Sequence, residues 1–415
     1  MPPPLTQHLR YLVLAVLALF VLLHFVFSST SETYASHVPT LSSAKEKFLG
    51  SAWGTSNSDK YDVWFNGRRG GTENSSSGPK TGTTNRKLDK VNATFVSLAR
   101  NRDLWELLDS MRGIEDRFNS RLGLHYDWVM LNDEPFSEEF KRHTSGIASG
   151  KVHYGLIPKE QWGSGFPPGI NATLANEKIQ AMGKLPIPYG NSVPYRKMCR
   201  YNSGFFFEHD LLASYDYYWR VEPNVKFFCD LDYDPFALMQ KKKAKYGFVV
   251  SLYEYRETVE SLWKYTKEWM EKFPQHLAKP NLLNWISNDN GETYNMCHFW
   301  SNFEIGALDF YRSDAYRSYF KHLDDSGGFF YERFGDAPVH SVAAALMLKP
   351  EEIHYFSDIG YRHEPFQHCP VTALQNQCTC SVKTEENFEF HGYSCTPRWK
   401  EVTGYKASTL FNLGQ

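Results

Sequence analysis

Two apolar runs that each end in acidic residues lie in the segment from Tyr215 to Asp234, which reads YDYYWRVEPNVKFFCDLDYD. The first run stops at Glu222 and the second at Asp230, so the pattern predicts two strands with carboxylates at their ends. Open α/β sheets bind ligands at such strand ends, and paired acids there commonly hold a divalent cation that bridges a diphosphate. Alternatively, these acids only terminate the strands and cap the next element.

A strand, a helix and a second strand are expected at the start of the folded region. Ala93–Ala99 and Tyr126–Leu131 have the pattern of buried strands, and apolar residues from Leu104 to Met111 recur at helical spacing between them. This order predicts a parallel α/β sheet. Arg100 follows the first strand, where such sheets bind nucleotides, although a lone arginine there is also typical of a surface or capping residue. The stretch from Pro135 to Gly190 is loop-rich and predicts no functional group.

Polar residues interrupt the apolar segment from Tyr294 to Phe310, which contains Cys297, His298 and Glu304. Buried polar groups must be paired, so these residues belong either to a hydrogen-bonding network or to a site. A nucleophilic pair formed by Cys297 and His298 is disfavoured, because adjacent residues of a strand point to opposite faces.

Two helices and a strand are expected further on. Ser313 caps the first helix, and Asp336 opens the second, which runs to Leu348. His340 and Ser341 lie on the second helix, but without a partnered acid they make a weak serine-hydrolase motif. The strand Ile353–Phe356 follows.

The N-terminal region carries an uncharged apolar segment from Tyr11 to Phe27, about 17 residues long, which predicts a transmembrane anchor. Arg10 precedes it and no Lys or Arg follows until Lys45, so residues 1–10 should form a cytoplasmic tail. Residues 28–87 are polar and predict a luminal stem, and residues 88–415 a compact folded domain. The alternative is a signal peptide cleaved near Ala35.

Sequons and cysteines agree with a luminal location. Acceptor sequons occur at Asn74, Asn92 and Asn171, and the seven cysteines can form two or three disulfides and leave one thiol. A zinc site is a weaker alternative, because its central spacing is Cys-x-Cys rather than Cys-x-x-Cys; its candidate ligands are Cys369, Cys378, Cys380 and Cys395. A net charge of −2 gives no electrostatic footprint for nucleic acid.

Five motifs in order give the chain a family resemblance: CRYNSGFFF, YYWRVEPNVKFFCDLDYD, CHFWSNFEIG, ERFGDAPVHSVAAAL and DIGYRHEPFQHCP. Together they resemble the fungal Golgi α-1,2-mannosyltransferases of glycosyltransferase family 15, from roughly Val91 to Pro397. The resemblance implies a GT-A-like mixed α/β sheet flanked by helices, in a single-pass type II Golgi membrane protein with a luminal catalytic domain.

The resemblance also implies GDP-mannose as donor and Mn²⁺ as cofactor. The metal ligands fall on Glu222 and His363, rather than on the later Asp-Leu-Asp, and a carboxylate with an imidazole is a reasonable set for Mn²⁺. Glu304 matches the proposed nucleophile of these retaining enzymes. If the acceptor attacks from the front face instead, Glu304 only stabilises positive charge on the sugar, and both mechanisms stay open.

Further donor contacts implied by the resemblance fall on Tyr195 at the phosphate, Asp336 at the sugar and Arg100 at the nucleotide. The expected function is a retaining α-1,2-mannosyltransferase that extends O-linked or N-linked mannose chains of secreted glycoproteins. Asn224 departs from the family pattern, in which an aspartate often follows Glu-Pro. This departure leaves open a weak or inactive membrane-tethered mannan-binding protein. A mannosylphosphate transferase is a second alternative, because acceptor choice depends on loops such as Pro135 to Gly190.

Overall fold

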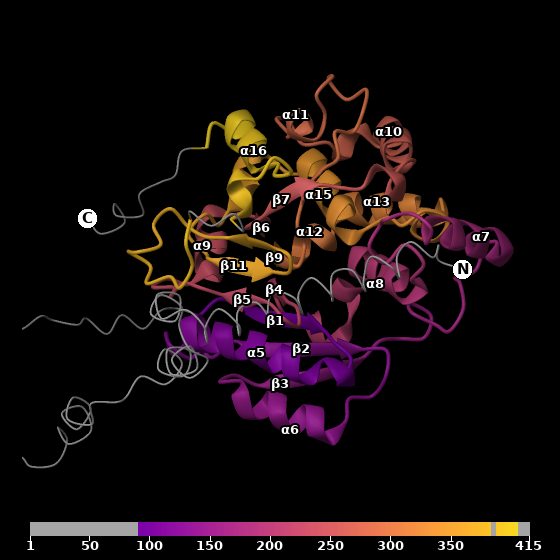
Figure 1. Cartoon of the computed structure of the whole chain (residues 1–415). Helices are drawn as coiled ribbons and strands as arrows, with labels where there is room; N and C mark the ends of the chain where they lie inside the picture. The colour runs from indigo at the N-terminus through magenta and orange to yellow at the C-terminus, as the bar shows by residue number, and fades with distance from the viewer. Residues whose placement is uncertain (1–89, 383–386, 406–415) are drawn as a thin grey trace, which may run out of the picture. The chain divides into compact units, whose positions relative to one another are not determined.

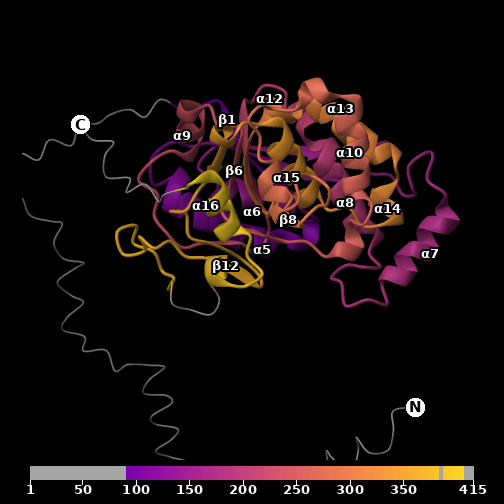
Figure 2. The same cartoon turned by 90° about the horizontal axis from the view of Figure 1, so that it is seen from above.

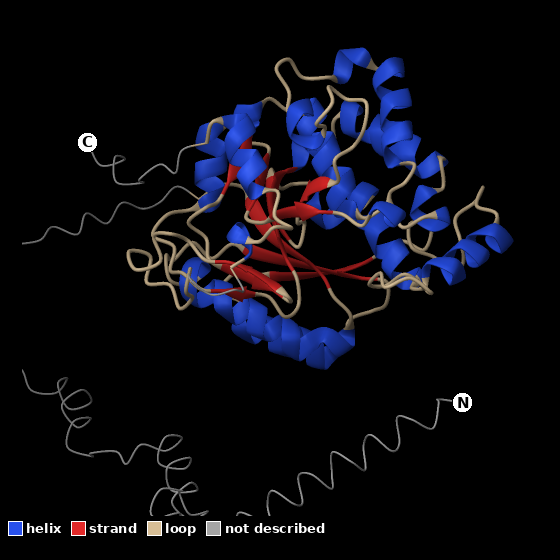
Figure 3. Ribbon diagram, turned by 45° about the horizontal axis from the view of Figure 1, so that its top comes forward, coloured by secondary structure: helices blue, strands red, loops and turns tan. Residues whose placement is uncertain are grey.

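A seven-stranded mixed sheet forms the centre of the fold in the computed structural model, which describes residues 90–382 and 387–405. Its strand order is β10-β6-β9-β4-β1-β2-β3. The strands are β1 (Ala93–Leu98), β2 (Asp127–Asn132), β3 (Val152–Leu156), β4 (Tyr217–Val221), β6 (Tyr246–Phe248), β9 (Phe303–Ala307) and β10 (Ile353–Tyr355). Figure 3 shows these strands between two groups of helices.

Strand directions divide this sheet into two parts. β3, β2, β1 and β4 are parallel to one another, whereas β9 runs antiparallel to both β4 and β6. The predicted parallel strand-helix-strand opening is confirmed, with the helix α5 (Leu104–Ile114) between β1 and β2. Because β9 lies between β4 and β6, it reaches the carboxyl end of β4 from the opposite direction.

Helices cover both faces of the sheet (Figure 1). α5, α6 (Glu138–Ile147) and α9 (Pro235–Lys242) contribute to the core on one face. The other face is covered by α8 (Val193–Gly204), α10 (Leu262–Lys272), α13 (Asp314–Asp325) and α15 (Asp336–Met347). Figure 2 shows α8, α13 and α15 close together, with α7 (Ala172–Met182) at the margin. The short helices are α11 (Leu283–Ile286), α12 (Leu308–Tyr311) and α14 (Gly328–Tyr331), and α16 (Thr396–Thr403) is the last described helix.

Side-chain alternation along each strand builds the two cores. Tyr217, Trp219 and Val221 of β4 face the α5 side, whereas Tyr218 faces the side of α8 and α15. Arg220 has the same parity as Tyr218, and its neighbour across β9 is Glu304. Two charged residues of the central strands are therefore directed to the face that α8 and α15 cover.

A second, smaller sheet has the order β12-β11-β5 and is formed by β5 (Lys226–Phe227), β11 (Tyr361–His363) and β12 (Phe366–His368). Both acid-ended runs are strands, as predicted, but they lie in different sheets, because β5 pairs with β11 and not with the central strands. β7 (Ser251–Tyr253) and β8 (Cys297–Phe299) form a separate pair. The small sheet is what carries His363 towards β4.

The stretch from Pro135 to Gly190 contains more regular structure than its composition suggests. It holds α6, α7 and the edge strand β3. β3 has only one buried residue, Gly155, and α6 buries only Phe140 and Thr144, so neither presents the apolar periodicity on which sequence patterns depend. The loop-rich interpretation of this stretch was wrong for these three elements.

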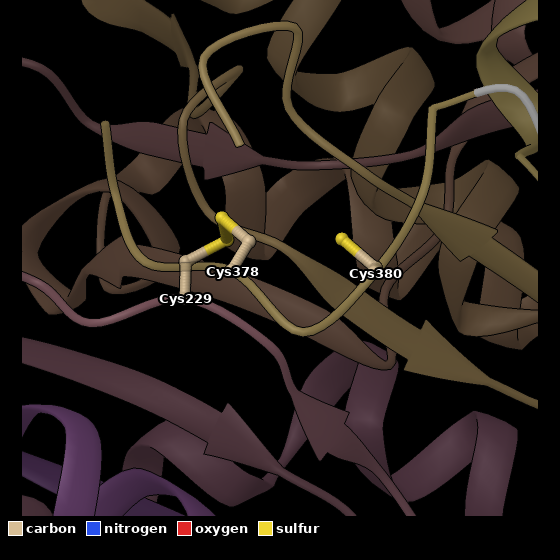
Figure 4. A group of neighbouring side chains, drawn as sticks. All are labelled: Cys229, Cys378 and Cys380. Carbon is tan, nitrogen blue, oxygen red and sulfur yellow. A yellow bond between two sulfur atoms is a disulfide. The ribbon is translucent and has the colours of Figure 1, made fainter. Parts of the chain in front are cut away.

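Three disulfides leave one thiol, as predicted. They are Cys229–Cys378, Cys297–Cys395 and Cys369–Cys380, and Cys199 is free and buried. The sulfurs of Cys229, Cys378 and Cys380 lie within 4.8 Å of one another (Figure 4). Because all the cysteines of the candidate zinc site are oxidised in pairs, they have no thiolate to offer a metal. The zinc alternative is therefore wrong.

The cytoplasmic tail, the anchor at residues 11–27, the stem and the sequon at Asn74 lie outside the described residues. Among residues 90–382 and 387–405, no helix has the length and apolarity needed to span a bilayer.

Candidate functional site

Glu222 and His363 face each other at the carboxyl end of β4. Glu222 directly follows that strand, and His363 ends β11. Glu222 Oε2 lies 3.8 Å from His363 Nε2, and both side chains are about 30% exposed, at 27% and 30%. Two ligand atoms at this separation, open to solvent, can coordinate one cation between them.

The second nitrogen of His363 determines which tautomer faces Glu222. Nδ1 lies 3.0 Å from the carbonyl oxygen of Glu364. A carbonyl oxygen only accepts, so Nδ1 carries a hydrogen, and Nε2 is the ring nitrogen that could bind a metal. Glu222 is oriented in a similar way, because Arg220 Nε donates to Oε1 at 2.9 Å and leaves Oε2 directed at His363. The donor set and its supporting contacts fit a borderline-hard divalent cation such as Mn²⁺.

Arg220 connects Glu222 to Asp336. Its guanidinium bonds both carboxylates, and Ser301 Oγ donates to Asp336 at 2.8 Å. Asp336 is the first residue of α15 and is only 4% exposed. Burial raises the pKa of Asp336, but Arg220 and His340 outweigh that effect, and the net pKa lies below its ordinary value. Asp336 therefore stays a carboxylate, fixed at the N-terminus of α15.

Glu304 is fully buried in β9 and accepts three side-chain hydrogen bonds. Oε1 accepts from the Tyr218 hydroxyl, and Oε2 accepts from the Tyr246 hydroxyl at 2.7 Å and from His340 Nδ1 at 2.8 Å. Glu304 also lines a cavity with Tyr218 and Arg220. The carboxylate is thus held rigidly, next to the residue that organises Glu222 and Asp336.

The electrostatics of this pocket keep Glu304 ionised. Burial raises its pKa, but the charge and hydrogen bond of His340, the charge of Arg220 and the Tyr218 hydroxyl outweigh burial and bring the pKa below its ordinary value. An ionised carboxylate can either attack an electrophilic carbon or stabilise positive charge near it.

Tyr195 lies on α8 and contacts two side chains through its ring. The Tyr189 ring is stacked on it at 4.5 Å between centroids, and the Arg333 guanidinium lies 5.1 Å from its centroid. Burial raises the pKa of Tyr195 well above its ordinary value, so the hydroxyl stays neutral and can donate a hydrogen bond. Arg333 is three residues before Asp336, which links Tyr195 to the start of α15.

Arg100 lies at the same edge of the central sheet as Glu222. β1 and β4 are parallel with Val96 opposite Arg220, so both chains leave the sheet at the same end. Arg100 is half-buried and begins a short 3-10 helix in which its backbone N–H donates to Asp103. Glu222 thus faces His363, and Arg220 bonds both Glu222 and Asp336 and lies opposite Glu304 across the β4–β9 pair. Arg100 is placed near them only by the strand register of β1 and β4.

The acids of the Asp-Leu-Asp-Tyr-Asp run have structural partners. Asp230 pairs with Arg117 and Arg121, and Asp232 pairs with Arg121. Asp234 Oδ1 caps α9 through the Phe236 N–H at 2.9 Å. For these acids, the alternative of strand termination and capping is the correct one.

Sequence reasoning missed Arg220 and His340 as site residues. Arg220 was visible as the one charge inside the buried run YYWRV, and His340 as a polar residue in a helix buried almost all round. Ser341 donates to the Ala337 carbonyl and accepts from the Phe299 N–H, so it acts within the helix packing and not as a nucleophile. Cys297 forms a disulfide with Cys395, which removes its thiol from chemistry.

Asn224 occupies a turn position after Glu222. Its φ of 62° lies in the left-handed region, and its N–H donates to the Glu106 carbonyl at 3.2 Å. Asn and Asp are among the few side chains that adopt this conformation readily. Exchange between these two residues is therefore compatible with the same backbone.

The chain matches a known family over residues 55–404, described as glycolipid 2-alpha-mannosyltransferase. It is 53% identical over 319 residues to glycolipid 2-alpha-mannosyltransferase 1 of Candida albicans, covering 77% of this chain and 73% of that protein. It is 49% identical over 311 residues to O-glycoside alpha-1,2-mannosyltransferase omh1 of Schizosaccharomyces pombe, covering 75% of this chain and 78% of that protein.

Solved structures agree with these sequence relatives. Core-mannan synthase A from Aspergillus fumigatus, in an Mn/GDP form, is 39% identical with a TM-score of 0.71, covering 77% of this chain and 87% of that one. The mannosyltransferase Ktr4p from Saccharomyces cerevisiae, in complex with GDP, is 35% identical with a TM-score of 0.68, covering 76% and 82%. Both support the predicted GT-A-like mixed sheet with flanking helices. The family resemblance of the motifs is thereby confirmed, and the chain belongs to the glycolipid 2-alpha-mannosyltransferases, glycosyltransferase family 15.

Proposed function

We propose that this chain is a retaining α-1,2-mannosyltransferase that moves mannose from GDP-mannose to mannose chains of secreted glycoproteins. The activity follows from its family and from relatives named as α-1,2-mannosyltransferases. One observation supports the proposal within the structure: Arg220 bonds Glu222, which faces His363, and lies across β4 and β9 from the buried carboxylate Glu304. A metal-binding pair and an ionised carboxylate are the two groups that sugar transfer from a nucleotide requires.

In this proposal, Glu222 Oε2 and His363 Nε2 would hold Mn²⁺. Bound there, the ion would supply positive charge that offsets the negative charge of the GDP diphosphate. The Glu364 carbonyl and Arg220 keep the two ligand side chains in orientation, at the 3.8 Å separation described above. A solved relative in an Mn/GDP form supports this choice of metal.

Donor binding is assigned to three further residues. The neutral Tyr195 hydroxyl donates to a donor phosphate, Asp336 accepts from a sugar hydroxyl, and Arg100 binds in the nucleotide region. Asp336 suits its role because Arg220 and Ser301 fix one of its oxygens at the start of α15. Arg100 is placed by the strand register of β1 and β4, at the edge where parallel strands end.

Glu304 acts on the mannosyl group itself. In a double displacement, its Oε1 attacks the anomeric carbon and the bond to the GDP oxygen breaks. The acceptor oxygen then attacks the same carbon, Glu304 leaves as a carboxylate, and the acceptor proton passes to the GDP phosphate; two inversions retain the configuration. In front-face transfer, the ionised Glu304 stabilises the oxocarbenium-like sugar while the acceptor attacks from the side of departing GDP. Both mechanisms need a carboxylate, which the lowered pKa of Glu304 provides.

The test is transfer by the purified full-length protein, using GDP-mannose and methyl α-mannoside with Mn²⁺ or EDTA. We expect an α-1,2 disaccharide that forms with Mn²⁺ and not with EDTA, and a loss of turnover in Glu304→Gln with GDP binding preserved. Binding of GDP-mannose without any transfer would instead favour the mannan-binding alternative. A phosphodiester-linked product would identify a mannosylphosphate transferase.

The proposed location is the Golgi membrane, with residues 11–27 as a type II anchor, residues 28–87 as the stem and residues 88–415 as the luminal catalytic domain. Asn171 offers a test, because it is an exposed sequon residue whose Oδ1 caps α7. When the protein is made in fungal cells, endoglycosidase H should lower its apparent mass on a gel by removing N-linked glycans. Asn171→Gln should make this change in apparent mass smaller. A protein with no glycan, accessible to protease in intact microsomes, would contradict a luminal domain.

A further inference from the structure

His340 is buried in the middle of α15 and makes contacts through both ring nitrogens. Nδ1 lies 2.8 Å from Glu304 Oε2, and Nε2 lies 3.0 Å from the backbone carbonyl oxygen of Asn202. The side chain is fully buried. His340 therefore joins three elements: α15, the strand β9 that carries Glu304, and the helix α8 that carries Asn202.

The two partners determine how many hydrogens the ring carries. A backbone carbonyl oxygen only accepts, so Nε2 donates to Asn202. A carboxylate also only accepts, so Nδ1 donates to Glu304. A ring that donates from both nitrogens is an imidazolium. His340 and Glu304 therefore form a buried ion pair instead of a hydrogen bond between neutral groups.

Aromatic and charged side chains surround the ion pair. Tyr218 and Tyr246 donate to Glu304, whereas the rings of Tyr311 and Tyr316 lie 5.1 and 6.0 Å from the His340 ring. Asp336, on α15 with His340, and Arg220, opposite Glu304, are the other charged side chains that act on the pair. Three of the roughly four acceptor positions of the Glu304 carboxylate are filled, which leaves one, on Oε1.

We propose that His340 is the positioning residue of the transfer reaction: as an imidazolium bonded to Oε2, it holds Glu304 ionised and fixed, with one acceptor position left on Oε1, beside the cavity that Glu304 and Arg220 line. This inference rests on the proposed function, because it assigns His340 a role in mannosyl transfer. The hydrogen-bond partners of the His340 ring are Glu304 and Asn202, and its charge also acts on Asp336, so its role in transfer is one of positioning. Donor binding by Glu222, His363 and Tyr195 does not depend on it.

The experiment is a double-mutant cycle on the full-length protein with His340→Phe, Glu304→Gln and both together. Mannose transfer gives kcat and KM, and calorimetry gives the affinity for GDP with Mn²⁺. We expect His340→Phe to lower kcat about 10- to 100-fold, the usual effect of losing a group that orients another, with GDP affinity within about twofold of the wild type. In the Glu304→Gln background, His340→Phe should cause no further loss of kcat.

A matched control is Tyr316→Phe. It removes another buried hydrogen bond next to His340, from the Tyr316 hydroxyl to the Ser203 carbonyl at 2.7 Å, without touching Glu304. A lower Tm with unchanged kcat is expected. If His340→Phe does not fold, His340→Asn, which keeps an N–H donor but no charge, is measured with the same expectation.

Two results would overturn the role of His340. A normal kcat in His340→Phe would show that Glu304 does not need it, and a parallel loss of kcat and GDP affinity would show a merely structural residue. Failure of the proposed function gives a different pattern, in which the wild type transfers no mannose. In that case the same four proteins are compared by chemical unfolding: additive effects of the two substitutions on stability would also refute the ion pair.

Discussion

Charged side chains of both signs meet on the face of β4 and β9 that α8 and α15 cover. Arg220 and the imidazolium of His340 are positive, and Glu222, Glu304 and Asp336 are negative, so the group carries one excess negative charge before any ligand binds. Buried charges are tolerated only when paired, and each of these has a partner within the group. The excess negative charge lies on the side that faces His363, which suits a divalent cation and, with it, an anionic donor.

Glu304 gives the first prediction at this scale, for the pH dependence of stability. Its pKa in the folded chain lies below the ordinary value of 4.5, so ionisation of Glu304 stabilises the fold above that pH, and this contribution is lost as pH falls through the folded pKa. We expect the difference in unfolding free energy between wild type and Glu304→Gln to shrink as pH falls below about 5 and through the folded pKa of Glu304. Urea unfolding at a series of pH values measures it.

The opposite trend would contradict the assigned charge state. If the difference grew as pH fell below about 5, Glu304 would be protonated in the folded protein and could not act as a carboxylate.

Asn224 gives a second prediction, because its conformation is left-handed. Asn224→Asp keeps a side chain that accepts this backbone and should change the unfolding free energy by less than about 0.5 kcal/mol. Asn224→Ala should cost about 1 kcal/mol, since alanine disfavours positive φ. Chemical denaturation checks both. Equal stability of the two variants would show that the turn does not impose this φ.

At the scale of elements, the site depends on two sheets that meet at the end of β4. The central sheet carries Glu222 and Glu304, and the small sheet carries His363 on its middle strand, β11. Two disulfides attach a neighbouring loop to this small sheet: Cys229 follows β5, Cys369 follows β12, and both bond the segment Cys378–Cys380. The position of His363 thus depends on covalent links outside the central core.

Removing both of these disulfides should therefore weaken metal binding more than it lowers the stability of the central sheet. The variant with Cys229, Cys369, Cys378 and Cys380 replaced by serine should lose Mn²⁺-dependent GDP affinity at temperatures where the central sheet is still folded, as followed by circular dichroism. The matched control replaces Cys297 and Cys395, which link β8 to α16. We expect the control to lower global stability by about 2–5 kcal/mol while GDP affinity is kept. Equal effects of the two replacements on GDP affinity would contradict the claim that the disulfides of the small sheet are the ones that position His363.

The elements that were predicted correctly from the sequence have apolar residues at a regular spacing. β1, α5 and β2 were predicted because their apolar residues alternate or recur at helical spacing, as were α13, capped by Ser313, and α15. β3 and α6 were missed because few of their side chains are buried. The pairing of β5 with β11 was missed for a different reason: a local pattern identifies a strand but does not say which sheet it joins.

The site was predictable only in part, because a local sequence pattern does not report contacts between distant elements. The family motifs pointed to Glu222, Glu304 and His363, and the structure brings Glu222 and His363 face to face. The contact between His340 and Glu304 joins residues 36 positions apart in different elements, so no local spacing reveals it. Arg220 was the one missed residue with a clear local signal, a charge within a buried strand.

At the scale of the whole molecule, every proposed site residue lies between Arg100 and His363 in the sequence, after the proposed anchor and stem. A fragment of residues 88–415, secreted from a fungal host, should therefore transfer mannose with a kcat close to that of the full-length protein. A folded, soluble fragment without activity would show that residues before 88 belong to the catalytic unit.

The central claim is that Glu222 and His363, and not the Asp-Leu-Asp acids, hold the metal. The most direct measurement is Mn²⁺ binding in the presence of GDP, followed by electron paramagnetic resonance, for wild type, Glu222→Gln and Asp232→Asn. Asp232 is the matched control, since it is a neighbouring acid whose partner is Arg121. We expect Glu222→Gln to lose bound Mn²⁺, whereas Asp232→Asn should bind Mn²⁺ as the wild type does. Retention in Glu222→Gln, or loss in Asp232→Asn, would contradict it.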